Sequence, residues 1–236
     1  MPPDQNVLIE PVRSKEEPEA TAARLFRDIA GDYQRWARIL SLGQDARWRR
    51  LMVGGIQLAP GSLVLDVAAG TGSISRLLES RAYRVMAVDL SHEMLTQHPG
   101  RHRVRAVADH LPFPEETFDA VTFGYLLRYV EDPVATMREV GRVLRPGGLV
   151  GMVEFGRPRG IAGLLWRVYT WVVLPVAGAM IGSGWYQVGR FLGSSIDRFH
   201  EDNPDLSRRW EDAGLVDITV RRLSLGGGLV MWARKP

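Results

Sequence analysis

Short apolar runs and helical patterns alternate along the chain between residues 60 and 156. The run at 63–65 is continuously apolar, as in a strand buried on both faces of a parallel sheet. The next segment, 73–81, instead places its isoleucine and leucines on one side at helical spacing. Further strands are predicted at the other apolar runs, which are 85–88, 104–108, 118–127 and 149–155. This alternation predicts an α/β fold with a doubly wound, Rossmann-like parallel sheet and helices on both of its faces.

The segment 21–58 carries apolar side chains at three- and four-residue spacing, which predicts helices broken near Gly31 and Gly43. This helical segment has two interpretations, which are compatible with each other. It is a packing layer against one edge of the sheet, or a lid over a bound cofactor that brings Tyr33 and the run 48–50 near the site.

The two ends of the chain differ in character. Residues 1–20 are polar and proline-rich, so we expect a flexible leader and no signal peptide. Residues 201–236 predict a helix followed by an antiparallel pair of strands. We therefore expect a single domain over 21–236, with its cofactor-binding core at 60–156.

A shift in composition marks 157–200 as an insert between the fifth and sixth strands. Residues 160–182 are apolar except for Arg167 and Thr170. The run has about the length of a membrane span, yet it contains Arg167, Pro175 and four glycines. We expect a helical insert that lines an apolar substrate pocket or dips into a membrane interface. A spanning helix and a plain core helix are the alternatives.

A glycine turn follows the first strand and begins the next helix, at Gly70-Thr71-Gly72. Such a turn holds a ligand against bare backbone N–H groups. Asp66 precedes it, and Asp89 ends the next apolar run, where a second parallel strand would place a carboxylate beside a ribose diol. A nicotinamide-binding turn would read GxGxxG, whereas this turn has Ala68 and an acid four residues before Gly70. The pattern favours S-adenosylmethionine (SAM), whose amino acid end is cationic.

Composition narrows the function further. The 236 residues contain no cysteine, which excludes disulfides, thiol catalysis and zinc–thiolate sites. The formal net charge of +3 is too small to indicate nucleic acid, and neither a basic stripe nor the Asn/Asp-Pro-Pro-aromatic motif of nucleic-acid methylases is present. The five histidines lack metal-ligand spacing, so we predict no metal site.

Several segments together resemble the ubiquinone/menaquinone biosynthesis C-methyltransferases from about residue 24 to the end. They are LFRDIAGDYQ, LSLGQDARWRR, LDVAAGTG, LPFPEETFDAVTFGYLLRYVEDP, REVGRVLRPGGLVGMVEFGRP, FLGSSIDRF and AGLVDITV followed by GGG. The resemblance implies a seven-stranded sheet, SAM at its crevice, and methyl transfer to a ring carbon of a prenylated hydroquinone, typically demethylmenaquinol.

The resemblance also implies roles for individual residues. Asp66, Ala68, Gly70 and Gly72 would border the methionine part of SAM, and Asp89 would bind the ribose hydroxyls. Ala108 would lie by the adenine. The predicted cofactor-binding set is completed by Thr71, Leu90, Met94, Asp109 and Phe123.

The chain departs from the family pattern mainly on the acceptor side. An asparagine that follows Arg128 in the family is Tyr129 here, a glycine two positions before Arg128 is Leu126, and Tyr-Asp in the first helix is Tyr33-Gln34. Near the adenine, the usual Asp or Asn aligns with Val107. The threonine usual before the last glycines is absent. Because of these differences, a family member that methylates another lipophilic acceptor is the alternative.

For catalysis we predict Arg128, Tyr129 and Tyr33. Arg128 would stabilise an oxyanion on the acceptor, since an arginine pKa is too high for a good base at neutral pH. Tyr33, Tyr129 and His110 are candidate proton acceptors, although nothing in the sequence brings a partner to His110.

Three functions remain: a quinol C-methyltransferase, an N- or O-methyltransferase of a phospholipid headgroup or other hydrophobic small molecule, and a SAM-binding partner without turnover. We expect a cytoplasmic protein that contacts the inner face of the membrane peripherally and binds no nucleic acid. A homodimer is compatible with the sequence.

Overall fold

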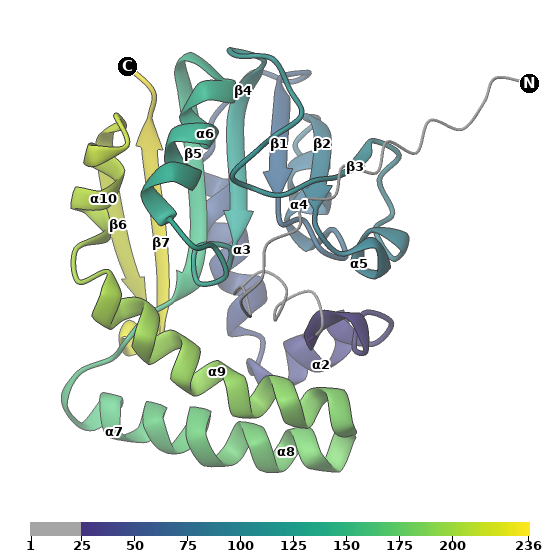
Figure 1. Cartoon of the computed structure of the whole chain (residues 1–236), viewed down its shortest axis with the longest axis vertical. Coiled ribbons are helices and arrows are strands. Elements are labelled where there is room, and N and C mark those ends of the chain that lie inside the picture. Colours follow the sequence, from purple (N-terminus) through teal and green to yellow (C-terminus); the bar gives the residue numbers. More distant parts are fainter. Residues whose placement is uncertain (1–24) are drawn as a thin grey trace, which may run out of the picture.

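A seven-stranded sheet forms the centre of the computed structural model, which describes residues 25–236 (Figure 1). The predicted leader at 1–20 and the first residues of the predicted lid lie outside the described residues. The strand order is β3-β2-β1-β4-β5-β7-β6. The strands are β1 (Leu63–Val67), β2 (Arg84–Asp89), β3 (Arg103–Arg105), β4 (Phe118–Gly124), β5 (Leu144–Phe155), β6 (Val216–Leu223) and β7 (Gly228–Arg234).

Strands β1 to β5 pair in parallel, and β7 pairs antiparallel with both β5 and β6. The predicted doubly wound α/β fold and the antiparallel final pair are confirmed. Because the parallel strands run in one direction, their carboxyl ends meet at one edge of the sheet, where such sheets bind ligands.

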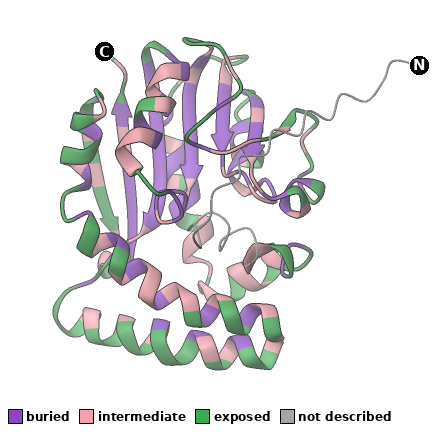
Figure 2. Ribbon diagram, in the orientation of Figure 1, coloured by how far each residue is buried: buried purple, intermediate pink, exposed green. Residues whose placement is uncertain are grey.

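Two hydrophobic layers cover the sheet. On one face the core includes side chains of α3 (Gln44–Gly55) and α4 (Ser73–Glu79), and on the other it includes those of α6 (Pro133–Val143) and α10 (Leu206–Asp212). Neighbouring strand residues alternate between the layers, since Val64 belongs to the first and Leu65 to the second. Figure 2 shows the resulting buried strands between partly exposed helices. A shorter helix, α5 (His92–Thr96), begins at the N-cap Ser91, whose side chain accepts a hydrogen bond from the Met94 amide as predicted.

The predicted insert is a helical hairpin beyond the carboxyl ends of the parallel strands (Figure 1). Its first arm is α7 (Gly160–Val168), a π-helical turn η1 (Tyr169–Val173) and α8 (Leu174–Ile181), and its second arm is α9 (Ser183–Asp202). A Cβ on Gly178 would lie 2.4 Å from the Trp185 carbonyl oxygen, so this glycine permits the two arms to pack closely.

The helices before the sheet break where predicted. Helix α2 (Tyr33–Leu40) follows a turn at 28–32, and α3 begins after Gly43, whose φ of +74° favours glycine. Several strand boundaries differ from the prediction. β4 ends at Gly124 rather than at residue 127, and β5 begins at Leu144 rather than at residue 149. β1 continues to Val67, so Asp66 lies inside the strand, and β3 ends at Arg105 rather than at residue 108.

Candidate functional site

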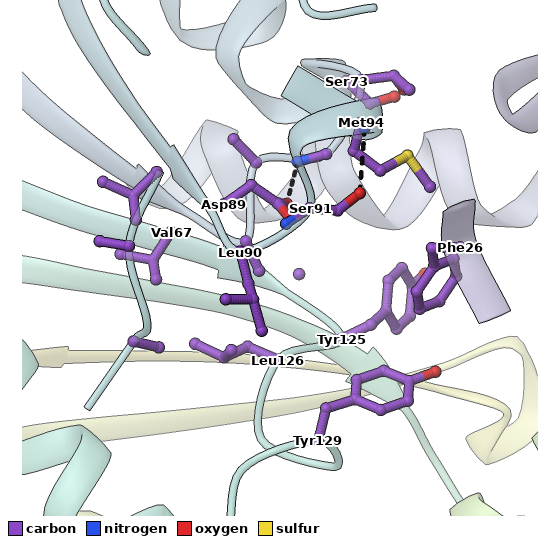
Figure 3. Close-up of a pocket in the computed structure, with 18 of the residues that line it drawn as sticks. Phe26, Val67, Ser73, Asp89, Leu90, Ser91, Met94, Tyr125, Leu126 and Tyr129 are labelled. Atoms are coloured by element: carbon purple, nitrogen blue, oxygen red, sulfur yellow. Dashed lines mark hydrogen bonds between the residues drawn. The ribbon is translucent and has the colours of Figure 1, made fainter. Parts of the chain in front are cut away.

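A cavity opens at the carboxyl ends of β1, β2 and β4 (Figure 3). Most of the predicted cofactor residues line it, namely Ala68, Gly70, Thr71, Asp89, Leu90, Met94 and Ala108. They come from the glycine turn, from the end of β2 with the helix after it, and from the segment that leaves β3. The structure thus brings these residues together around one space.

Asp89 ties the glycine turn to the end of β2. Its Oδ2 accepts a hydrogen bond from the Gly70 amide at 2.7 Å, and its Oδ1 accepts one from the Ser91 amide at 2.8 Å. Burial raises the pKa of Asp89, although these backbone donors act in the opposite direction. A carboxylate oxygen has more than one lone pair, so Asp89 can hold the turn and still accept from a ligand diol.

Asp66 does not line the cavity, and its place beside the cofactor stays a prediction. Its side chain is fully buried between α4 and β4, and accepts hydrogen bonds from the Ser75 hydroxyl at 2.5 Å and the Thr122 hydroxyl at 3.1 Å. Burial raises the pKa of Asp66 to about 6. Asp66 lies within β1 with its side chain toward α4, whereas the next strand residue, Val67, lines the cavity.

Three other predicted cofactor residues also lie away from the cavity. Gly72 packs against the His98 ring, where a Cβ would come within 2.9 Å. Phe123 is fully buried, with its ring centroid 6.2 Å from that of Trp210. Asp109 is exposed in the turn after β3. Each has a structural role or faces solvent, so none of the three contributes a side chain to the cavity.

A second, apolar cavity adjoins the first. Its walls come from α2, α3, the segment after β4, the helical hairpin and the turn at 224–225. Four aromatic residues line both cavities: Phe26, Tyr33, Tyr125 and Tyr129. We call these four the aromatic boundary, and Figure 3 shows three of them, Phe26, Tyr125 and Tyr129, at the side of the first cavity. A molecule in the apolar cavity can therefore meet one in the first cavity only beside these rings.

The three predicted catalytic residues come together at the apolar cavity, which Tyr33, Arg128 and Tyr129 all line. The Arg128 guanidinium centre lies 4.8 Å from the Tyr129 ring centroid. Burial raises the pKa of Tyr33 to about 12, and it also raises the pKa of Tyr129. Both phenols therefore remain protonated near neutral pH. His110 is exposed and lines neither cavity.

Arg128 is held in a buried ion pair. Its Nε donates to Glu154 Oε1 at 2.8 Å and one of its Nη atoms donates to the Ser195 hydroxyl at 2.9 Å. Burial opposes its charge, but the Glu154 carboxylate together with the Tyr129 and Tyr125 hydroxyl groups raises the pKa of Arg128. Among the described residues, Glu154 Oε2 has no hydrogen-bond partner. Arg128 is thus a fixed cation at the wall of the apolar cavity.

Sequence reasoning missed a polar cluster at the same boundary. Asp45 Oδ1 accepts hydrogen bonds from the Tyr125 hydroxyl at 2.6 Å and from Arg49 Nε at 2.7 Å. Asp45 lines the apolar cavity, Arg49 lines the first cavity, and Tyr125 lines both. The ion pair of Asp45 and Arg49 could have been predicted, because the two residues are four apart on one helix. The contact of Asp45 with Tyr125 could not, because the two residues are 80 positions apart in the sequence.

The first cavity fits SAM. Among its lining residues in the described part of the chain, Asp89 is the one carboxylate and Arg49 the one cation. They match a ribose diol and an amino acid carboxylate, while Leu90, Met94 and Ala108 offer apolar contact for an adenine. Gln34 supports the turn, because its side-chain amide donates to Thr71 O and Thr71 Oγ1.

Known proteins share both the sequence and the fold. Residues 13–235 match the ubiE/COQ5 methyltransferase family. The chain is 37% identical to a demethylmenaquinone methyltransferase of Mycolicibacterium gilvum, over 88% of this chain and 91% of that protein. It is 34% identical to a ubiquinone/menaquinone biosynthesis C-methyltransferase of Desulfotalea psychrophila, over 90% of this chain and 89% of that protein.

Solved structures show the fold alone, since their sequences are distant. A SAM-dependent methyltransferase of Thermotoga maritima superposes with a TM-score of 0.65 at 18% identity, over 90% of this chain and 99% of that one. A phosphoethanolamine N-methyltransferase of Haemonchus contortus in complex with SAM superposes with a TM-score of 0.60 at 16% identity, over 82% of this chain and 53% of that one.

Proposed function

The chain belongs to the ubiE/COQ5 methyltransferase family, and we propose that it transfers a methyl group from SAM to a ring carbon of a prenylated quinol of the demethylmenaquinol type. The enzyme is a SAM-dependent methyltransferase. The names of the relatives at 37% and 34% identity support the quinol as acceptor.

The observation that carries the proposal is the aromatic boundary between the two cavities. Flat rings at this boundary suit a flat ring as acceptor, because aromatic side chains pack face to face or edge to face against it. Two boundary residues already stack in this way, since the Tyr33 and Trp185 rings lie 6.2 Å apart at 12° and the Tyr129 and Phe191 rings 6.0 Å apart at 15°. The rest of the apolar cavity suits an isoprenoid tail.

We further propose that the outer face of the hairpin rests on the membrane. Residues Gly160–Ile181 are long and apolar enough to span a bilayer, but the helix packs along one side on α9, through Thr170, Leu174 and Gly178. The other side exposes Ile161, Leu164, Val172 and Met180. Leu165 is also exposed and lines the apolar cavity, so an acceptor dissolved in the membrane has a short path into this cavity.

One observation favours a second candidate, N-methylation of an amine on a lipid headgroup. The aromatic boundary with Trp185 surrounds the meeting point with π faces, which attract methylated ammonium groups. A fixed cation, Arg128, stands at the same wall and opposes such a substrate. We therefore rank the quinol first.

The test is methyl transfer from labelled SAM to demethylmenaquinol, to phosphatidylethanolamine and to a total lipid extract. We expect label in the quinol. Label only in the phospholipid would replace the quinol by the headgroup, and label in neither, with SAM still bound, would remove both acceptors.

A further inference from the structure

Asp45 and Tyr125 form a hydrogen-bonded pair at the point where the two cavities meet. Asp45 comes from the first turn of α3, and Tyr125 follows β4 directly. The Tyr125 hydroxyl donates to Asp45 Oδ1 at 2.6 Å, and Tyr125 lines both cavities. A molecule that touches the Tyr125 oxygen is therefore one hydrogen bond away from a carboxylate.

The pair is held in place from several sides. Tyr125 has a left-handed φ of +60°, and its amide donates to Val153 O at 2.9 Å. Its ring stacks on Phe155 at 4.6 Å between centroids, and the Arg49 guanidinium lies 5.2 Å from its centroid. A strained backbone that its surroundings maintain is common at functional sites. The hydroxyl of Tyr125 therefore has a defined direction, toward Asp45.

Asp45 is the one carboxylate among the described residues that line the apolar cavity. Its Oδ1 is used by Tyr125 and Arg49, and no described residue donates to its Oδ2. The other polar side chains there do not accept protons readily. Burial raises the pKa values of Tyr33 and Tyr129, and Arg128 remains charged beside Glu154.

We propose that Asp45 is the proton acceptor for the acceptor's hydroxyl group, and that the Tyr125 hydroxyl passes the proton to it. This inference rests on the proposed function, because it needs an acceptor that becomes nucleophilic by losing a hydroxyl proton. In this proposal Tyr33 and Tyr129, which were candidate proton acceptors, line the site and do not act as the base.

The acceptor O–H bond breaks, its proton bonds to the Tyr125 oxygen, and the proton of Tyr125 moves to Asp45 Oδ1. The acceptor ring carbon forms a bond to the methyl group while the sulfur of SAM keeps the electron pair of the broken bond. The ring carbon then loses its hydrogen as a proton to water. The acceptor oxygen recovers the first proton from Asp45 through Tyr125, so one proton is released per methyl group.

Two substitutions separate this role from a structural one. Asp45→Asn keeps an oxygen that accepts from both Tyr125 and Arg49, but removes the basicity. Tyr125→Phe keeps the ring on Phe155 and removes the relay. We expect kcat to fall about 100-fold or more in each variant, as general base losses do. The Kd for SAM should stay within about twofold, because Asp45→Asn keeps an oxygen for Arg49 and Tyr125→Phe keeps the ring that lines the first cavity.

Two readouts would not respond to a structural role. Formate should restore part of the kcat of Asp45→Ala by supplying a small carboxylate in the space left. The ratio of wild-type to Asp45→Asn rates should shrink with electron-poor quinols, whose hydroxyl groups lose protons more easily. Asp32→Asn, an exposed acid before α2, is the matched control and should leave kcat unchanged.

Two different failures can be told apart. If wild type methylates the quinol and Asp45→Asn does so equally fast, this inference is wrong and the proposed function stands. If kcat falls but neither formate nor an acidic quinol changes the deficit, Asp45 has a structural role and the inference is also wrong. If wild type methylates no acceptor with an ionisable hydroxyl, the proposed function fails and the proton role falls with it.

Discussion

The two cavities share a wall but are built in different ways. The SAM cavity is made largely of short segments at the ends of β1, β2 and β3, with backbone groups and Asp89 fixed by the parallel sheet. The apolar cavity is made of side chains from α2, α3, the helical hairpin and the turn at 224–225. The first is a local consequence of strand, turn and helix, whereas the second exists only after distant parts of the chain have packed together.

This difference predicts that substitutions in the two cavities have separate effects on SAM binding and on the acceptor. Changes in the sheet edge should act on SAM binding, and changes in the hairpin should act on the acceptor or on membrane contact. The Asp45–Tyr125 pair lies between them and should affect turnover with little effect on SAM binding.

The largest expected effect is on the SAM side. Asp89→Ala leaves the Gly70 and Ser91 amides without their carboxylate and removes the acceptor for a ribose diol. We expect the Kd for SAM to rise roughly 100-fold, because hydrogen bonds to charged groups contribute about 1.5–3 kcal/mol. Titration calorimetry measures it. Asp109→Ala is the control, since Asp109 is exposed outside the cavity, and equal losses in both variants would contradict this assignment.

The next effect concerns the proposed membrane contact of the hairpin. Ile161 and Leu164 are 82% and 63% exposed on α7. The double change Ile161→Asp with Leu164→Asp should lower partitioning onto anionic vesicles roughly 30-fold, because each apolar side chain contributes about 1 kcal/mol when about half of it is buried in the membrane interface. Vesicle sedimentation measures it. Val216→Asp, on the exposed edge strand β6, should leave partitioning unchanged, and a loss there of the same size would show that general charge is responsible.

A smaller effect is expected inside the apolar cavity. Ala162 lines it, whereas Ala179 is exposed on the same hairpin and does not. Ala162→Trp should raise KM for a long-tailed quinol about tenfold by filling space that the tail needs, at a cost of about 1.4 kcal/mol. Ala179→Trp should leave this KM unchanged. Unchanged KM in Ala162→Trp would mean that the tail lies elsewhere.

The smallest effect tests a structural role for Asp66. A pKa near 6 in the folded state is above the unfolded value of 3.8, so the folded protein takes up this proton more readily. The contribution of Asp66 to stability therefore rises as pH falls from about 7 to about 4. Asp66→Asn should be more stable than wild type at pH 8 by about 1 kcal/mol, after allowance for weaker hydrogen bonds from Ser75 and Thr122.

Urea denaturation at pH 8 and pH 5 measures this difference, which should shrink toward pH 5. Unchanged Kd for SAM would agree with a buried structural role. A rise in Kd like that of Asp89→Ala would return Asp66 to the cofactor site.

The same contrast explains what the sequence could predict. The Gly70–Gly72 turn and Asp89 follow short apolar runs, so their positions were readable from local pattern, and so was the cofactor. The burial of Asp66 under α4 was not readable in this way, because it depends on the side of β1 from which the side chain projects. Tyr125 was taken as part of a strand, but the chain turns there into a left-handed conformation that no periodicity signals. Its contact with Asp45 depends on packing of α3 against the sheet.

The measurement that tests the account most directly is a crystal structure with S-adenosylhomocysteine and a short-tailed demethylmenaquinol. The account predicts the quinol ring at the aromatic boundary, with its hydroxyl on Tyr125 and its tail in the apolar cavity. A ring bound away from Phe26, Tyr33, Tyr125 and Tyr129 would contradict it.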